Sequence, residues 1–253
     1  MSLPVHLVPD LAGVAPGRTV LVEGDEAHHA VAVRRMRVGE QLQLTEGRGT
    51  VVTGEVAETG KRRLLVRALE VRTEPEPQPR LVVVQALPKG DRGELAVEVL
   101  TEVGVAEVVP WAAARSVAVW RGERVAKGLA RWRATAREAA KQARRPWHPQ
   151  VADLATTEDV LARVAAATLA LVLHEDATVG LAGLALPAEG EVLLVVGPEG
   201  GLAEAELAAL RDAGAQVVRL GAEVLRTSTA GLAAAAALLA RTPRWGAAGE
   251  PLP

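Results

Sequence analysis

Five short apolar runs, separated by longer segments with helical periodicity, constrain the fold of this 253-residue chain more than any other feature. The runs lie at 81–87, 106–112, 168–175, 191–197 and 216–221. Strands that are apolar along their whole length are typical of a parallel sheet that helices cover on both faces. We therefore predict an α/β domain after residue 80, ending in a helix within TSTAGLAAAAALLART (227–242).

The residues before 73 have a different pattern, in which polar and apolar positions alternate over short runs punctuated by glycine. The runs RTVLVEG, EQLQLTEG, GTVVTGEVAE and RRLLVRALEV predict a small β-rich domain, with one helix around DEAHHAVAVRRM that has Asp25 as its N-cap. TEPEPQP, with proline at every second position, predicts an extended linker. The expected boundaries are a first domain at 1–72, a linker at 73–79, a second domain at 80–245 and a tail at 246–253.

Composition excludes several classes of protein. The chain has no cysteine, so disulfides, thiolate ligands and cysteine nucleophiles are excluded. Its longest apolar runs, such as Val164–Leu173, are too short to span a bilayer, and the N-terminal sequence lacks the pattern of a secretion signal. We expect a cytoplasmic protein with no membrane partner.

The net charge of −2 conceals a strongly basic segment. From Arg115 to Arg145 there are ten Arg and Lys residues and only two Glu. Lys127 and Arg131, and then Arg137, Lys141 and Arg145, recur at helical spacing, so a helix could present this charge on one side. A solvated helix face is the alternative, but the size of the excess favours a nucleic acid as partner.

Three segments follow the carboxyl ends of predicted strands, where ligands bind in such sheets. They are LHEDAT, GPEGGL and LGAEVLRTSTA. GPEGGL has neither the lysine of a phosphate loop nor the spacing of a dinucleotide fingerprint, and Glu199 would repel a phosphate. A neutral or cationic ligand, such as an adenosyl sulfonium, suits this turn better.

Two other chemistries rank below this one. His28 and His29 are adjacent and point different ways, and no third residue has ligand spacing, so we predict no metal. His174, Glu175 and Asp176, together with Ser228, could suggest a hydrolase, but the serine is not in a G-x-S-x-G motif and nothing in the sequence brings these groups together.

Five separated motifs stand out in the chain: HHAVAVRRMRVGEQLQL, ALPKGDRGELAVEVLTEVGVAEVVPWAAARSV, REAAKQARRPWHP, VGPEGGL and LGAEVLRTSTA. In this order and spacing they resemble the RsmE family of SPOUT-class methyltransferases, which act on N3 of a uridine in small-subunit ribosomal RNA. The resemblance implies a PUA-like RNA-binding β-barrel followed by a parallel-sheet SPOUT domain with a C-terminal trefoil knot. Knots are rare exceptions to the rules of chain topology, so periodicity could not have suggested one. The resemblance further implies a homodimer, S-adenosyl-L-methionine as cofactor and 16S ribosomal RNA, within the assembled small subunit, as partner.

Site residues are carried over by position. The cofactor pocket is expected to be lined by Leu173, His174, Gly197, Pro198, Glu199, Gly200, Gly201, Leu202, Leu220, Gly221, Leu225, Arg226, Thr227 and Ala230. For RNA binding we expect Arg34, Arg35, Arg37, Lys89, Arg92, Arg115, Gln142 and Arg145.

Arg226 is the predicted catalytic residue. It precedes the last predicted helix, where a cation could stabilise charge on the uracil ring or hold a phosphate; pairing with a carboxylate is the alternative role. Three positions depart from the family pattern: Ser228 stands where Glu is usual, Glu223 where a basic residue is common, and Val99 where Lys is expected. Two other functions therefore stay open, a non-catalytic RNA-binding assembly factor and a SPOUT enzyme that modifies another atom, such as a ribose 2′-hydroxyl.

Overall fold

The computed structural model describes residues 3–245, and the chain divides into two compact units. The first unit comprises the residues up to 76 together with 140–148, and the second comprises 77–139 and the residues from 149 onward. The sequence pattern gave no indication that 140–148 joins the first unit. The expected tail at 246–253 lies outside the described residues.

The first unit is built on a five-stranded sheet. Its strands, in spatial order, are β1 (Val5–Leu7), β3 (Gln41–Thr45), β4 (Thr50–Thr59), β5 (Arg63–Thr73) and β2 (Thr19–Glu23). All neighbouring pairs are antiparallel except β1 and β3. The four predicted runs form β2 to β5, so the β-rich prediction is confirmed.

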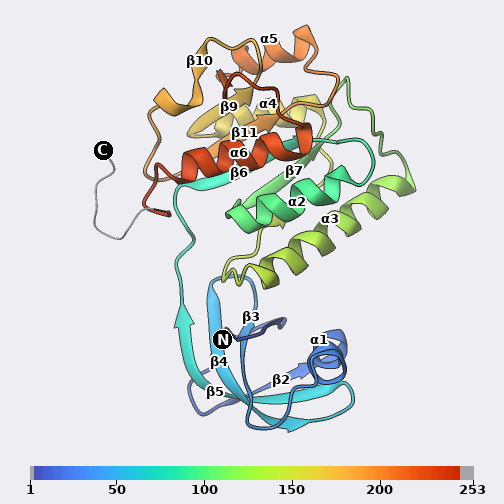
Figure 1. Ribbon diagram of the computed structural model, residues 1–253, viewed down its shortest axis with the longest axis vertical. Helices are drawn as coiled ribbons and strands as arrows, with labels where there is room; N and C mark the ends of the chain where they lie inside the picture. The colour runs from blue at the N-terminus through green and yellow to red at the C-terminus, as the bar shows by residue number, and fades with distance from the viewer. Residues whose placement is uncertain (1–2, 246–253) are drawn as a thin grey trace. The chain divides into compact units, whose positions relative to one another are not determined.

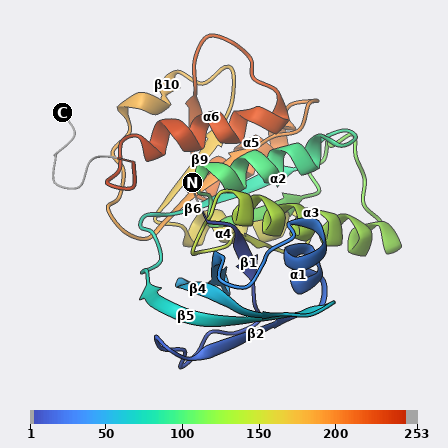
Figure 2. The same ribbon diagram turned by 60° about the horizontal axis from the view of Figure 1, so that its bottom comes forward.

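Long strands β4 and β5 are strongly curved (Figure 2). Their pairing register shifts between Thr53 and Gly54 and again before Glu58. A Cβ at Gly54 would lie 2.4 Å from Cγ1 of Val66, so the strands approach each other more closely than a side chain would allow. Glycine and the register shift together let the sheet wrap around its own core.

The helical segment of the first unit is α1 (Gly24–His28), which continues as a π-helical turn, η1 (His29–Val33). The prediction that Asp25 is the N-cap is wrong, since the capping position is Glu23 and no side chain caps the helix. Gly24, with φ of 71°, turns the chain into the helix one residue early. The carboxylate of Asp25 instead pairs with Arg62 at 2.5 Å.

The second unit is built on a parallel sheet of seven strands. Their spatial order is β10 (Val179–Gly180), β12 (Gln216–Arg219), β9 (Leu169–Leu173), β11 (Glu191–Val196), β6 (Arg80–Ala86), β7 (Glu107–Trp111) and β8 (Gln150–Val151). The five predicted runs form the five central strands, which confirms the α/β prediction. The two-residue edge strands β8 and β10 have no periodicity that could have revealed them.

Helices cover both faces of this sheet, as strands without a polar face require. On one face, alternate strand residues such as Val83 and Leu194 pack against α2 (Arg92–Val103), α3 (Glu123–Gln142) and α6 (Thr227–Leu239). The remaining strand residues pack on the other face with α4 (Thr157–Ala166) and α5 (Glu204–Asp212). Helices α2 and α6 lie side by side (Figure 1).

The C-terminal part of the sheet has an unusual chain path. β11 follows β9 and lies beside it, and β12 then crosses to the other side of β9. Helix α6 returns to pack on β6 and β11 and contacts η2 (Leu181–Gly183), which lies in the β9–β11 connection. This order is consistent with the trefoil knot that the resemblance implies. Among the described helices, none is both long and apolar enough to cross a membrane.

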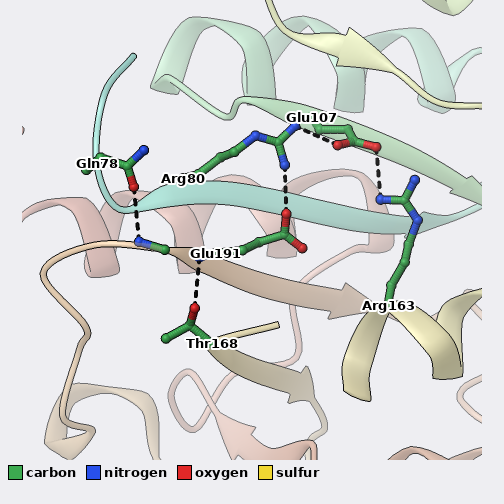
Figure 3. A network of polar contacts seen from close by, with 7 residues as sticks. Gln78, Arg80, Glu107, Arg163, Thr168 and Glu191 are labelled. Atoms are coloured by element: carbon green, nitrogen blue, oxygen red, sulfur yellow. Dashed lines mark hydrogen bonds and ion pairs between the residues drawn. The ribbon is translucent and has the colours of Figure 1, made fainter. Parts of the chain in front are cut away.

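Ion pairs join the strands at their amino ends (Figure 3). Arg80, the first residue of β6, donates from Nη1 to Glu191 Oε2 and from Nη2 to Glu107 Oε2, each over 2.7 Å. Arg163 of α4 lies 2.9 Å from the other carboxylate oxygen of Glu107. The Glu107 side chain is only 9% exposed, so two arginines neutralise a carboxylate that would be costly to bury alone.

Candidate active site

A cavity of about 330 Å³ lies at the opposite, carboxyl end of the sheet in the second unit. It is bordered by the three loops that follow β9, β11 and β12, the same three segments that the sequence singled out. Its volume lies within the range of small-molecule sites, roughly 300–1,000 Å³. The cavity is therefore the candidate active site.

The expected cofactor residues gather in this cavity. Those that line it are Leu173, His174, Gly197, Pro198, Glu199, Gly201, Leu202, Leu220, Gly221, Leu225, Arg226, Thr227 and Ala230. Gly200 does not line it and instead faces Arg115. Further lining residues were not among the expected ones; they are Arg92, which was expected to bind RNA, and Glu175, Val196, Arg219, Ala222, Glu223 and Val224. Most of these lie inside the recognised motifs, so the motifs themselves were the signal that could have identified them.

The turn after β11 needs its glycines for different reasons. Gly201 has φ of 70°, a left-handed conformation that L-residues with side chains rarely adopt, and its N–H donates to Pro198 O over 2.9 Å. Gly200 packs against the main chain, because a Cβ there would lie 3.1 Å from Arg115 O. Both glycines keep the turn compact, so that main-chain groups of 197–202 border the cavity.

A buried carboxylate fixes this turn to its neighbours. Glu206, in the first turn of α5, accepts through Oε2 from the Ala203 N–H at 3.3 Å. Its Oε1 accepts from the Ala114 N–H at 2.9 Å and from the Thr157 hydroxyl at 3.2 Å. Arg115 also donates to Leu202 O over 3.3 Å. The loop after β7 is thereby held against the loop after β11.

His174 has a defined hydrogen-bonding role at the cavity wall. Its Nδ1 accepts from the Asp176 N–H at 3.2 Å, so in the neutral ring the proton lies on Nε2. The imidazole therefore offers a donor through Nε2. Ser228 is buried in α6 and does not line the cavity, so the hydrolase alternative has no support from the geometry.

Arg226 is the residue that precedes α6 and occupies its N-cap position, with φ of −68° and ψ of 148°. Its carbonyl accepts from the Thr229 and Ala230 N–H groups, which anchors the main chain, whereas its side chain is exposed and lines the cavity. Within residues 3–245 no carboxylate pairs with its guanidinium. The structure therefore does not support the alternative role of Arg226, in which it pairs with a carboxylate.

Charges of both signs line the cavity. The cations are Arg92, Arg219 and Arg226, and the carboxylates are Glu175, Glu199 and Glu223. Glu199 accepts a hydrogen bond from the Lys89 N–H at 3.1 Å, so its carboxylate is turned toward the loop after β6. A ligand with separated positive and negative groups matches such a wall better than a simple anion does.

The expected RNA-binding residues lie in both units. In the first unit, Arg34, Arg35 and Arg37 are exposed at the end of η1, and Arg35 has φ of 56°. In the second unit, Lys89 and Arg115 are exposed on the loops after β6 and β7, and Arg92 begins α2. Gln142 and Arg145 belong to the 140–148 segment of the first unit; Gln142 is exposed and Arg145 is partly buried.

Carboxylates of the chain itself neutralise much of the basic segment. Ion pairs in the second unit join Lys127 to Glu123, Arg131 to Glu94, Arg133 to Asp153 and Arg137 to Glu138. Two of these carboxylates, Glu94 and Asp153, come from outside the 115–145 segment, so the chain itself relieves part of the charge repulsion along this helix.

Lys141 is the clearest case, because it lies in a buried polar cluster of the first unit. Its Nζ is 2.7 Å from Glu26 Oε1, and His6 Nδ1 is 3.3 Å from Glu26 Oε2. Burial alone would raise the pKa of Glu26, but hydrogen bonds from His6 and Lys141 and the charge of Lys141 outweigh it and lower the pKa to about 2. Burial, together with the charge of Lys141, lowers the pKa of the neighbouring His29. This cluster fixes the 140–148 segment within the first unit.

Within the part of the chain that the structure describes, no three His, Cys, Asp or Glu side chains are grouped so that they could hold a metal ion.

Comparisons with known proteins place this geometry in a family. A family model described as an RNA methyltransferase domain matches residues 74–239, and one described as an RNA methyltransferase PUA domain matches 22–69. Ribosomal RNA small subunit methyltransferase E of Mycobacterium tuberculosis is 48% identical over 251 residues, which cover 98% of this chain and 94% of that protein. The Bacillus subtilis protein of the same name is 32% identical over 232 residues, covering 88% and 91%.

Solved structures agree with these matches. Ribosomal RNA small subunit methyltransferase E from Neisseria gonorrhoeae, bound to S-adenosyl methionine, has a TM-score of 0.83 at 28% identity, covering 94% of this chain and 97% of that one. A putative methyltransferase from Legionella pneumophila, in complex with bound SAM, has a TM-score of 0.85 at 27% identity, covering 96% and 99%. The chain therefore belongs to the ribosomal RNA small subunit methyltransferase E family of RNA methyltransferases.

Proposed function

We propose that this protein transfers the methyl group of S-adenosylmethionine to N3 of a uridine in 16S ribosomal RNA of the small subunit. The observation that carries the proposal is the cavity at the carboxyl end of the sheet, where the motif residues from three separate loops come together. Relatives named ribosomal RNA small subunit methyltransferase E, one of them 48% identical to this chain, support the proposal. The structure of the Neisseria gonorrhoeae protein of that name, bound to S-adenosyl methionine, supports it as well.

The cavity fits the cofactor in size and chemistry. Main-chain groups of 197–202 and 220–226 border it and can hydrogen-bond to adenine and ribose, because Gly201 and Gly221 carry no side chain that would cover them. Carboxylates of Glu175 and Glu223 suit the cationic end of the molecule. S-adenosylmethionine supplies a methyl group on a sulfonium, which is a good leaving group.

The residues of the chain have two tasks in the reaction, alignment and charge stabilisation. The loops hold the two reactants in line, which removes most of the entropic barrier to their encounter. Negative charge develops on the uracil oxygens when N3 loses its proton, and the unpaired Arg226 guanidinium on the cavity wall stabilises it. The departing proton has Glu175, Glu223 and solvent as acceptors at this site.

RNA is held by cations outside the cavity as well as in it. Arg34, Arg35 and Arg37 have no carboxylate partner among the described residues, which leaves their charge available for phosphates. Lys89, Arg92 and Arg115 serve the same purpose beside the cavity, and Gln142 and Arg145 complete the set. The proposal includes recognition of the assembled small subunit, a homodimer and a cytoplasmic location, all of which rest on the family resemblance.

Mass spectrometry of the product tests the proposal. The purified protein is incubated with isotope-labelled S-adenosylmethionine and small ribosomal subunits from cells that lack this gene, and the RNA is digested to nucleosides. We expect labelled 3-methyluridine. A labelled ribose 2′-O-methyl nucleoside would instead establish a SPOUT enzyme for another atom. Binding of cofactor and subunit without any methylated product would instead indicate a non-catalytic assembly factor, the alternative suggested by Ser228 in place of the usual Glu.

A further inference from the structure

The carboxylate of Glu199 would repel an anionic ligand, yet it lies in the middle of the turn at 197–202 that borders the cavity. Its side chain is exposed, and among residues 3–245 no Arg or Lys side chain forms an ion pair with it. Its Oε1 accepts instead from the main-chain N–H of Lys89, over 3.1 Å. The contact joins the loop after β11 to the loop after β6, two segments 110 residues apart in the chain.

The loop that receives this contact is otherwise weakly held. Leu87 is tied to Trp111 by a main-chain hydrogen bond, and helical bonding resumes with the Leu95 N–H, which donates to Asp91 O. Between these points, the bond to Glu199 is the one hydrogen bond that the described structure gives for residues 88–90. Pro88 is buried, but Lys89 and Gly90 are exposed, and Gly90, with φ of 68°, has open space where a Cβ would lie, so packing does not replace the missing bonds at these two residues.

Arg92 follows this loop directly and depends on its position. It is the first residue of α2, is partly buried, and lines the cavity with no carboxylate partner in the described part of the chain. The preceding Asp91 forms no side-chain capping bond, so the start of α2 is not fixed from within the helix. Gly93 packs directly on Trp132 and holds the helix from the other side, so residues 88–91 share in setting the placement of the Arg92 guanidinium.

We propose that Glu199 is a positioning residue for RNA: by holding the Lys89 N–H, it keeps Arg92 in the cavity wall, where Arg92 binds a phosphate of the substrate. The inference rests on the proposed function and adds a role for the carboxylate of the turn. The turn that borders the cofactor cavity thus also places a cation for the second substrate. Because Glu199 acts through a neutral N–H donor, its acceptor oxygen matters and its charge does not.

Substitutions at Glu199 separate the acceptor from the charge. Glu199→Ala removes the acceptor, and we expect KM for RNA to rise about tenfold, which is within the range of one ordinary hydrogen bond. Glu199→Gln retains a carbonyl oxygen, so KM should stay within about threefold of the wild type. Calorimetry without RNA measures the cofactor Kd of both variants, and a loss of cofactor affinity in Glu199→Ala as large as its rise in KM for RNA would overturn the proposal.

Substitutions at Lys89 test the same bond from the donor side. Lys89→Pro deletes the N–H and leaves the turn at 197–202 unchanged, whereas Lys89→Ala removes only the side chain and serves as its matched control. We expect Lys89→Pro to raise KM for RNA above that of Lys89→Ala by about the factor seen for Glu199→Ala. Equal KM values for the two variants would overturn the proposal.

A double-mutant cycle decides whether Glu199 acts through Arg92. We expect Glu199→Ala combined with Arg92→Ala to have the KM of Arg92→Ala alone. Effects that multiply, or a Glu199→Gln variant as impaired as Glu199→Ala, would show that the carboxylate acts directly on a ligand and would overturn the proposal. A wild-type protein that neither binds the cofactor nor methylates RNA would refute the proposed function instead, which keeps the two failures distinguishable.

Discussion

The two ends of the parallel sheet use arginine and glutamate side chains in opposite ways. At the amino end, Arg80, Glu107 and Glu191 begin three neighbouring strands, and Arg80 pairs with each of the two carboxylates at 2.7 Å. At the carboxyl end, Arg92 and Arg226 line a cavity, and no carboxylate of the described chain neutralises them.

This difference separates stability from function within one sheet. Paired charges at the amino end satisfy each other and have nothing left to offer a ligand. Unpaired charges around a cavity contribute little to folding but are available to substrate.

The largest effect is expected at the carboxyl end, for Arg226→Ala. Loss of the guanidinium removes charge stabilisation in the transition state, and we expect kcat to fall about 100- to 1,000-fold at saturating cofactor. The melting temperature should not change, because the side chain is exposed and unpaired. Single-turnover methylation and thermal unfolding of the same preparation measure both quantities. A wild-type rate in this variant would contradict the assigned role.

The opposite outcome is expected at the amino end, for Glu107→Ala. This variant leaves Arg80 and Arg163 without the carboxylate that both contact, and we expect the free energy of unfolding to fall by about 3 kcal/mol. The methylation rate per folded molecule should remain that of the wild type, because Glu107 is at the far end of the strands. Chemical denaturation and an active-site titration provide the two measurements. A selective loss of activity in stable protein would break the comparison.

The first unit offers a third, smaller effect that depends on pH. The pKa of Glu26 is about 2 in the folded protein and 4.5 in its unperturbed state, so its contribution is present above about pH 5 and is lost as pH falls toward 2. We expect this contribution to be about 3 kcal/mol. Hydrogen exchange of first-unit amides at a series of pH values measures it in the wild type and in Glu26→Gln. The stability difference between the two proteins should shrink as the pH is lowered, and a constant difference would be inconsistent with the assigned ion pairs.

The smallest effect is expected for Gly200→Ala. The added Cβ would lie 3.1 Å from Arg115 O, so the turn must shift by a few tenths of an ångström. We expect the cofactor Kd to rise about three- to tenfold with little loss of stability. Gly183→Ala is the matched control, because a Cβ at Gly183 meets nothing within 4 Å. Equal affinities for the two variants would mean that the turn does not need its compact form.

Much of the fold could be predicted because its signals are local. The five apolar runs form the central strands, and thirteen of the fourteen expected cofactor residues line one cavity. The parallel sheet brings together loops that are distant in the chain, because all strands end at the same edge. The exception, Gly200, is a glycine whose space is taken by a neighbouring loop, which the turn sequence does not reveal.

What could not be predicted depends on contacts between distant segments. Helical spacing placed Lys141 on a basic helix face, but Glu26 of α1 pairs with it, and a periodicity argument cannot identify a partner 115 residues away. Two-residue strands such as β8 (Gln150–Val151) are too short for any pattern to show. The hydrogen bond between Glu199 and Lys89 could not be predicted either, because it joins residues 110 positions apart in the chain.

A crystal structure of the protein with S-adenosylmethionine is the most direct test of the claim that the carboxyl end of the sheet is the functional end. We predict that the cofactor lies in the cavity, with main-chain groups of 197–202 and 220–226 within about 3 Å of its polar atoms. The amino-end pairs of Arg80 should be unchanged. A cofactor bound elsewhere on the chain, with the cavity loops making no contact to it, would contradict the account.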